Sequence, residues 1–190
     1  MQQWGRGRPG ILLDRDGTII VDHGYVSCIE QVEFIDGAPD AIAEFNRAGI
    51  PVAVVTNQAG VARGYYGLED VKRVHRHIAA GLAERGAHID LFLSCPYHPD
   101  GVVPSFTRLS EDRKPRPGMA RKAAEALGLD LTRSCVVGDR PEDLGLAAAV
   151  GASAVYVGPG DVSAPGVWSY PTLGAATAFI IERTSLCPRT

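Results

Sequence analysis

The chain has 190 residues, of which 45 % are hydrophobic and 22 % are charged, and its formal net charge is −3. A length below roughly 250 residues predicts one globular domain over residues 1–190, and the ordinary composition excludes a disordered chain. The acidic pI of about 5.9 and the absence of a Lys/Arg run argue against a nucleic-acid partner. No apolar run approaches the roughly 20 residues of a membrane-spanning helix, so we expect no membrane partner.

The chain ends and the cysteines suggest where the protein acts. We expect residues 1–9 and 186–190 to be flexible tails. Arg6 and Arg8 are not followed by an apolar segment, so no signal peptide is predicted. The four cysteines lie far apart and form no CxxC pair, which predicts neither a disulfide framework nor a zinc ribbon. We therefore expect reduced thiols and a cytoplasmic protein, and we take it to be a monomer.

Short apolar runs alternate along the chain with segments of helical periodicity. Buried strands of a parallel sheet are predicted over residues 10–13, 51–55, 89–93, 135–137 and 154–157. Helices are predicted over 38–48, 68–85, 119–127 and 143–150, and a last helix after residue 159. Glycine follows the first four helices, at positions 49, 86, 128 and 151, where a left-handed residue commonly ends a helix. The alternation predicts an α/β fold with a mainly parallel central sheet.

Polar side chains follow three of the predicted strands and precede one predicted helix. In open α/β sheets, ligands bind beyond the carboxyl ends of the strands, so we expect these side chains to share one crevice. They are Asp14 and Asp16 after the first strand, Thr56 after the second, Asp139 and Asp143 after the fourth, and Lys114 before the third helix.

These residue types together suit phosphoryl transfer. A close acid pair favours a hard cation, and its members can divide the work between nucleophile and proton carrier. A threonine hydroxyl and a lysine are donors for phosphate oxygens. Asp139 would complete the cation site and Asp143 would support it by hydrogen bonding. Each segment alone also fits an ordinary polar turn, a helix cap or a solvated basic run.

Longer stretches resemble a known family. They are DRDGTII (14–20), DHGYV (22–26), FIDG (34–37), TNQAGVARG (56–64), CPYHP (95–99) and RKPRPGM (113–119). These stretches resemble the haloacid dehalogenase (HAD) superfamily of phosphohydrolases. The nearest branch is the heptose-1,7-bisphosphate 7-phosphatases with the related histidinol-phosphate phosphatases. The resemblance runs from about residue 10 to 157 and implies a three-layer Rossmann-like fold. The short spacings between the motifs leave no room for an inserted cap domain.

The resemblance also implies roles for individual residues. Asp14 would attack phosphorus and form an aspartyl-phosphate, and Asp16 would protonate the leaving group and then activate water. Thr56 and Lys114 would bind the transferring phosphoryl group. Mg²⁺ would be held by the Asp14 side chain, the Asp16 carbonyl and Asp139, with Asp143 in support. The implied substrate contacts are Asp22, His23, Gly24, Tyr25, Asn57, Gln58, Ala59, Arg113 and Arg140, and either arginine would bind a second phosphate.

The chain departs from the family at a zinc-binding loop. Many members hold a structural zinc with Cys-x-His followed by Cys-x-Cys. Here Cys95 is kept, but Tyr97, Ser110 and Asp112 stand at the other three ligand positions. Because structural zinc takes four ligands, we expect this zinc to be absent. The resemblance implies that this loop borders the crevice and contributes to substrate selectivity.

Several functions remain open beside an Mg²⁺-dependent 7-phosphatase acting on a small phosphorylated sugar. Histidinol phosphate or another small sugar phosphate could be the substrate. A nucleic-acid 3′-phosphatase shares a similar second motif, but the acidic pI and the lack of a basic stripe argue against it. A non-catalytic protein that binds a phosphorylated metabolite is a further alternative.

Overall fold

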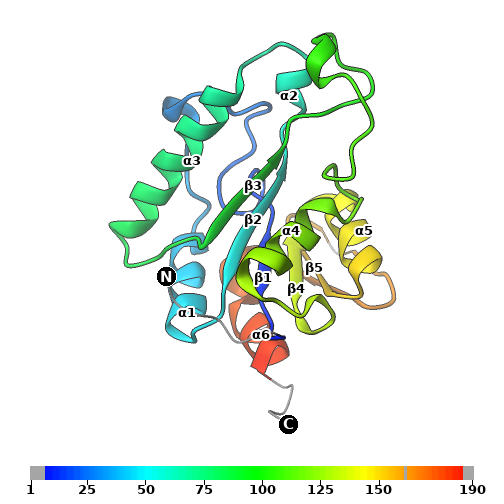
Figure 1. The fold of residues 1–190 in the computed structure, drawn as a ribbon. Helices are drawn as coiled ribbons and strands as arrows, with labels where there is room; N and C mark the ends of the chain where they lie inside the picture. Colours follow the sequence, from blue (N-terminus) through cyan, green and yellow to red (C-terminus); the bar gives the residue numbers. More distant parts are fainter. Residues whose placement is uncertain (1–6, 161, 186–190) are drawn as a thin grey trace.

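The computed structural model describes residues 7–160 and 162–185. Within these residues a six-stranded sheet forms the centre, with strand order β3-β2-β1-β4-β5-β6 and every neighbouring pair parallel (Figure 1). The strands are β1 (Ile11–Leu13), β2 (Val52–Asn57), β3 (Leu91–Cys95), β4 (Cys135–Gly138), β5 (Ser153–Val157) and β6 (Val167–Tyr170).

Helices cover both faces of the sheet. They are α1 (Ala38–Arg47), α2 (Ala59–Ala62), α3 (Leu68–Ala83), α4 (Gly118–Leu127), α5 (Pro141–Val150) and α6 (Leu173–Ser185). One core cluster joins one face of the strands to α1, α3 and α6, and a second joins the other face to α4 and α5. The predicted three-layer α/β fold is confirmed.

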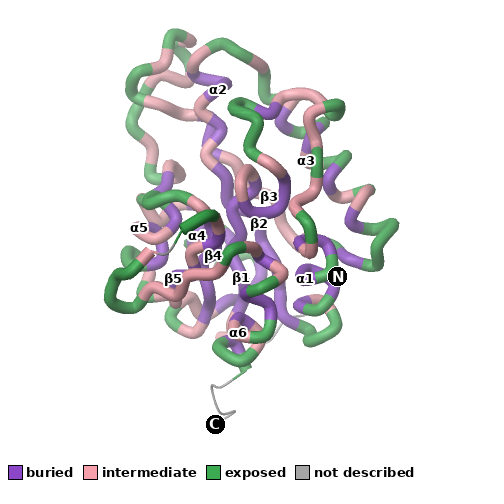
Figure 2. Tube along the Cα trace, turned by 180° about the vertical axis from the view of Figure 1, so that it is seen from behind, coloured by how far each residue is buried: buried purple, intermediate pink, exposed green. Residues whose placement is uncertain are grey.

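The strand sequences explain why the sheet sits at the centre. Successive side chains of a strand point to opposite faces, so Ile11 and Leu13 enter the first cluster and Leu12 the second. All three are 0 % exposed. A strand covered on both faces has no polar side, which is why the runs are continuously apolar. The buried strands run through the middle of the molecule, and most exposed residues lie in loops and on outer helix faces (Figure 2).

The five predicted strands and the predicted helices are confirmed, with ends shifted by a few residues. The glycines expected after the helices all have a left-handed backbone, with φ between 68° and 70°. The sequence analysis predicted neither β6 nor the single turn of α2. Residues 7–9, assigned to a flexible tail, are instead joined to the segment after α4, because Gly7 N donates to Gly128 O at 3.1 Å and Asp130 N to Arg8 O at 2.8 Å. Residues 1–6 and 186–190 lie outside the described residues.

The topology fixes where a site can form. The chain first moves outward from β1 to β2 and β3, then returns to the other side of β1 to form β4. This reversal leaves a crevice beyond the carboxyl ends of β1 and β4. The connection from β1 to α1 holds one short helix, at Ile29–Gln31, and that from β3 to α4 holds another, at Pro104–Phe106. Neither connection contains an inserted domain, as expected. No helix within residues 7–160 and 162–185 is long and apolar enough to span a membrane.

Candidate active site

The segment after β1 is fixed to β4 by its backbone. Asp14 N donates to Val137 O at 2.8 Å, which continues the β1–β4 pairing by one residue. The chain then turns at Gly17, whose φ of +80° is unfavourable for other residues. A Cβ at Gly17 would also overlap the Asp139 carboxylate. The turn therefore lets the segments after β1 and β4 approach each other closely.

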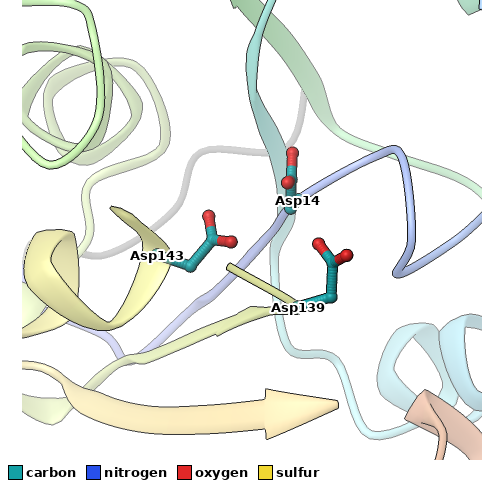
Figure 3. Close-up of side chains that lie close together, drawn as sticks. All are labelled: Asp14, Asp139 and Asp143. Carbon is teal, nitrogen blue, oxygen red and sulfur yellow. The ribbon is translucent and has the colours of Figure 1, made fainter. Parts of the chain in front are cut away.

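Three carboxylates meet at this point. Oxygen atoms of Asp14, Asp139 and Asp143 all lie within 4.8 Å of one another, and Figure 3 shows the three carboxylates around a common space. Asp139 Oδ1 is buried and has no hydrogen-bond partner among the described residues. A buried carboxylate oxygen without a partner is costly unless a cation or water satisfies it. The oxygen donors and the negative charge of this cluster fit a hard cation such as Mg²⁺.

Lys114 lies against the same cluster. Its Nζ is 2.9 Å from Asp14 Oδ1 and 2.6 Å from Asp143 Oδ1, and the residue is only 3 % exposed. Burial alone would lower the pKa of the ammonium group, but the two carboxylates outweigh burial and raise it. Asn57 fixes the Lys114 backbone, since its Nδ2 donates to Lys114 O and its Oδ1 accepts from Lys114 N. Lys114 is therefore held as a cation with its charge directed at Asp14.

Burial and mutual repulsion raise the pKa values of the acids around Lys114. Burial, with Asp14 nearby, raises the pKa of Asp139 to about 6. Burial and Asp14 raise the pKa of Asp143 as well, although Lys114 and the Arg140 backbone N–H oppose the change. Both Asp143 oxygens accept hydrogen bonds, Oδ1 from Lys114 and Oδ2 from Arg140 N. Asp143 is thus engaged with the protein, whereas Asp139 keeps a free oxygen.

The Asp16 side chain is held by a separate set of hydrogen bonds. Its oxygens accept hydrogen bonds from Arg15 and from Gln58 Nε2. Burial raises the pKa of the Asp16 carboxyl, although Arg15 opposes this. A raised pKa suits a carboxylic acid that must carry a proton near neutral pH.

Most of these side chains border one pocket of about 590 Å³. It brings together most of the residues selected from the sequence. Two selected residues are not among its lining residues. The His23 ring is half exposed, with its Nε2 3.4 Å from Glu33 Oε2, and Asp139 lies beside the lining residues Asp14 and Asp143. The lining residues are Asp14, Asp16, Asp22, Gly24, Tyr25, Thr56, Asn57, Gln58, Ala59, Tyr66, Arg113, Lys114, Arg140, Pro141, Glu142 and Asp143.

Known proteins share this sequence and this fold. A model of the HAD-hydrolase-like family matches residues 112–173. D-glycero-beta-D-manno-heptose-1,7-bisphosphate 7-phosphatase of Yersinia pestis is 45 % identical over 145 residues, 75 % of this chain and 77 % of the relative. This chain belongs to that family of HAD phosphatases.

Solved structures agree with this membership of the heptose-bisphosphate phosphatase family. D,D-heptose 1,7-bisphosphate phosphatase from B. bronchiseptica, solved with magnesium and phosphate, matches with a TM-score of 0.80 and 30 % identity over 92 % of this chain and 98 % of that one. A candidate HAD-like phosphatase from Mesorhizobium loti matches with a TM-score of 0.87 and 36 % identity over 100 % of this chain and 93 % of that one.

The loop in which this HAD phosphatase lacks three of the zinc ligands is held by packing. The Arg108 guanidinium lies 3.9 Å from the centre of the Tyr97 ring, and Tyr97 packs on Phe106 with centroids 5.9 Å apart. Lys122 Nζ reaches Asp112 Oδ2 at 2.6 Å, which joins the end of the loop to α4. Cys95 is buried and not disulfide-bonded. Tyr97 and Asp112 therefore make contacts of their own at two of the changed positions.

Sequence reasoning missed four residues of this HAD phosphatase site. Tyr66, Pro141 and Glu142 line the pocket, and Arg15, next to the lining residues Asp14 and Asp16, is 0 % exposed. Arg15 stands inside the DRDG motif between two selected acids, which was the one available signal. Because arginine is seldom fully buried, its residue type gave no reason to expect Arg15 inside the site.

Proposed function

We propose that this protein hydrolyses the 7-phosphate of D-glycero-D-manno-heptose 1,7-bisphosphate, with Mg²⁺, through an aspartyl-phosphate. The observation that carries the proposal is the position of Lys114, 2.9 Å from Asp14, beside a carboxylate cluster that Asp14 forms with Asp139 and Asp143. A nucleophile, a fixed cation and a metal-binding acid cluster are the parts that phosphoryl transfer requires. The Yersinia pestis relative carries the beta form in its name, so we expect the β anomer to be preferred.

The proposed mechanism divides the chemistry between two aspartates. Asp14 attacks phosphorus, the bond from phosphorus to the sugar oxygen breaks, and Asp16 gives its proton to that oxygen. Water then attacks the aspartyl-phosphate, Asp16 takes a proton from it, and the bond between phosphorus and Asp14 breaks to release phosphate. Thr56 and Lys114 bind the phosphoryl oxygens, on which the negative charge is spread in the transition state.

The metal site proposed for Mg²⁺ consists of the Asp14 and Asp139 side chains and the Asp16 backbone carbonyl. Asp143 supports this site by holding Lys114 and the Arg140 backbone. When bound, the cation neutralises part of the charge on the phosphoryl group and on the acid cluster. Arg113 and Arg140, at the pocket wall, are the proposed contacts for the second phosphate.

We also propose that the enzyme acts as a monomer in the cytoplasm. A single copy of the chain supplies every residue of the proposed mechanism, so the chemistry requires no second copy. The three cysteines in the described part of the chain are not disulfide-bonded, which supports a reducing compartment.

The proposed function is tested by phosphate release with Mg²⁺ from both anomers of the heptose bisphosphate, histidinol phosphate and hexose phosphates. We expect the highest kcat/KM for the β heptose bisphosphate and no turnover by Asp14→Asn or after chelation. Even, weak turnover of all substrates would refute the heptose assignment but keep the chemistry. Binding of the bisphosphate without phosphate release would instead indicate a non-catalytic protein.

A further inference from the structure

The side-chain amide of Gln58 has no hydrogen-bonding capacity left for a substrate. Gln58 is 2 % exposed. Its Nε2 donates to Asp16 Oδ2 and to Thr56 Oγ1, both at 2.9 Å. Its Oε1 accepts from Arg15 Nη2 at 3.1 Å and from the Tyr66 hydroxyl at 2.8 Å. An amide has two N–H donors and two acceptor positions, and all four are in use. The role of substrate contact expected for Gln58 therefore finds no support in its geometry.

Arg15 belongs to the same hydrogen-bond network. It is 0 % exposed, and it donates three hydrogen bonds of 2.9–3.1 Å to the Asp16 carboxylate. Its Nη2 also donates to Val26 O at 3.3 Å, and its backbone N–H donates to Asp14 Oδ1 at 2.7 Å. The Arg15 Nη1 is buried without a hydrogen-bond partner among the described residues, so Nε and Nη2 make all the contacts of the guanidinium with this network.

Both oxygens of the Asp16 carboxylate therefore accept hydrogen bonds from the protein. Three hydrogen bonds come from Arg15 and one from Gln58, and Tyr66 holds Gln58 in turn. Tyr66 is itself fixed by packing, because a Cβ at Gly60 would overlap its ring. These contacts leave Asp16 at the wall of the pocket beside Asp14.

We propose that Arg15 and Gln58 are positioning residues that hold the Asp16 carboxyl where the sugar oxygen departs. This inference rests on the proposed phosphatase function. The network acts on the proton transfer and not on recognition of the sugar. A positioned acid matters only for a leaving group that needs a proton. A sugar oxygen needs one, whereas the oxygen of p-nitrophenol leaves as a stable anion.

The test compares kcat for the heptose bisphosphate and for p-nitrophenyl phosphate in Gln58→Met and Arg15→Lys. For both variants we expect kcat on the heptose ester to fall roughly 10–100-fold, with a loss about tenfold smaller on p-nitrophenyl phosphate. Asp16→Asn should show the same preference for the aryl ester, more strongly. Lys114→Arg is the matched control, because Lys114 is assigned to the phosphoryl group and its side chain contacts Asp14 and Asp143 but not Gln58, so this variant should slow both esters equally.

Folding is checked separately by the melting temperature and circular dichroism of each variant. Tyr66→Phe is the milder variant: it removes one donor to Gln58, and we expect a smaller shift toward the aryl ester. The proposal would be overturned if kcat fell equally on both esters in Gln58→Met, Arg15→Lys and Tyr66→Phe. A rise in KM for the heptose ester with unchanged kcat in Gln58→Met would also overturn the proposal, because it would show that Gln58 binds the substrate. If the wild-type protein released phosphate from neither ester, the proposed function would fail along with this inference.

Discussion

Lys114 Nζ lies 2.6 Å from Asp143 Oδ1, and each side chain is at most 2 % exposed. Asp14 lies on the other side of the same ammonium group, at 2.9 Å. In such a buried cluster the attraction offsets the cost of desolvation only while every charge keeps its partner. Lys114 therefore has a structural part, which is to neutralise two acids, besides the proposed binding of the phosphoryl group.

The first prediction concerns the substitution Lys114→Met. Without Mg²⁺ it leaves the carboxylates of Asp14 and Asp143 buried and uncompensated, so we expect the free energy of unfolding to fall by about 3–5 kcal/mol. Mg²⁺ should restore part of the loss, because the cation replaces the missing positive charge. We expect kcat to fall by roughly 10²-fold or more. Urea denaturation with and without Mg²⁺ and phosphate-release kinetics measure these effects.

A double variant provides the control. When Asp143→Asn is added to Lys114→Met, one of the two unpaired acids is removed, and stability should rise above that of the single variant. The coupling energy from the complete cycle should be at least about 1 kcal/mol. Additive effects of the two substitutions would show that the pair is not coupled in the folded protein.

The fold and the place of the site could be read from the sequence because each depends on local patterns. The apolar runs mark the strands, and in a parallel sheet the residues after them must meet at one edge. Asp14, Thr56 and Asp139 follow such runs; the structure places Asp14 and Thr56 in one pocket and Asp139 against Asp14.

The side-chain network around Asp16 could not be read in this way. Gln58 and Asp16 are 42 positions apart, and no pattern specifies which donor meets which acceptor over such a separation. Full burial of Arg15 contradicts the usual position of its residue type. Strand β6 was missed for another reason: it follows a loop rich in glycine and proline, and its four residues are all only partly buried. Such an edge strand lacks the continuous apolar run of the central strands.

The second prediction concerns pH and Mg²⁺. Burial and Asp14 raise the pKa of Asp139 from 3.8 to about 6. Without metal the folded state keeps this proton to higher pH than the unfolded state, so the associated stability is lost as pH rises from about 4 to 6. Because Mg²⁺ binds the carboxylate form, its apparent affinity should fall below pH 6, by up to about tenfold per pH unit.

Calorimetric titration with Mg²⁺ between about pH 5 and pH 8 tests this dependence. This range extends roughly one unit below and two units above the pKa of Asp139. Asp143 has a raised pKa as well, so the transition should be broad. The Asp139→Asn variant should bind Mg²⁺ more weakly and with less dependence on pH. An affinity that stays constant across this range in the wild-type protein would contradict the prediction.

The third prediction concerns acid stability and His75 on α3. Its ring stacks on Phe92 with centroids 4.8 Å apart, and burial, with Arg15 contributing, lowers its pKa from 6.5 to about 3. The folded state therefore resists protonation, and stability should fall as pH drops from 6.5 toward 3, by up to about 1.4 kcal/mol per pH unit. His75→Phe should lose less stability between these pH values. His77→Phe, at an exposed position of the same helix, should behave as the wild type in acid denaturation experiments.

The fourth prediction concerns Arg140, whose Nη2 lies 2.7 Å from Asp22 Oδ2 and joins the segment after β1 to the start of α5. Both side chains are partly exposed, so this ion pair contributes at most about 1 kcal/mol and a phosphate dianion can displace Asp22. If Arg140 binds the second phosphate, Arg140→Met should raise KM for the bisphosphate about tenfold and leave KM for p-nitrophenyl phosphate unchanged. Arg47→Met, at an exposed position on α1, is the matched control and should change neither value. Steady-state kinetics with the two substrates measure both KM values. An equal rise in KM for both esters would contradict the prediction, because it would mean that Arg140 contacts the reacting phosphate or acts only through Asp22.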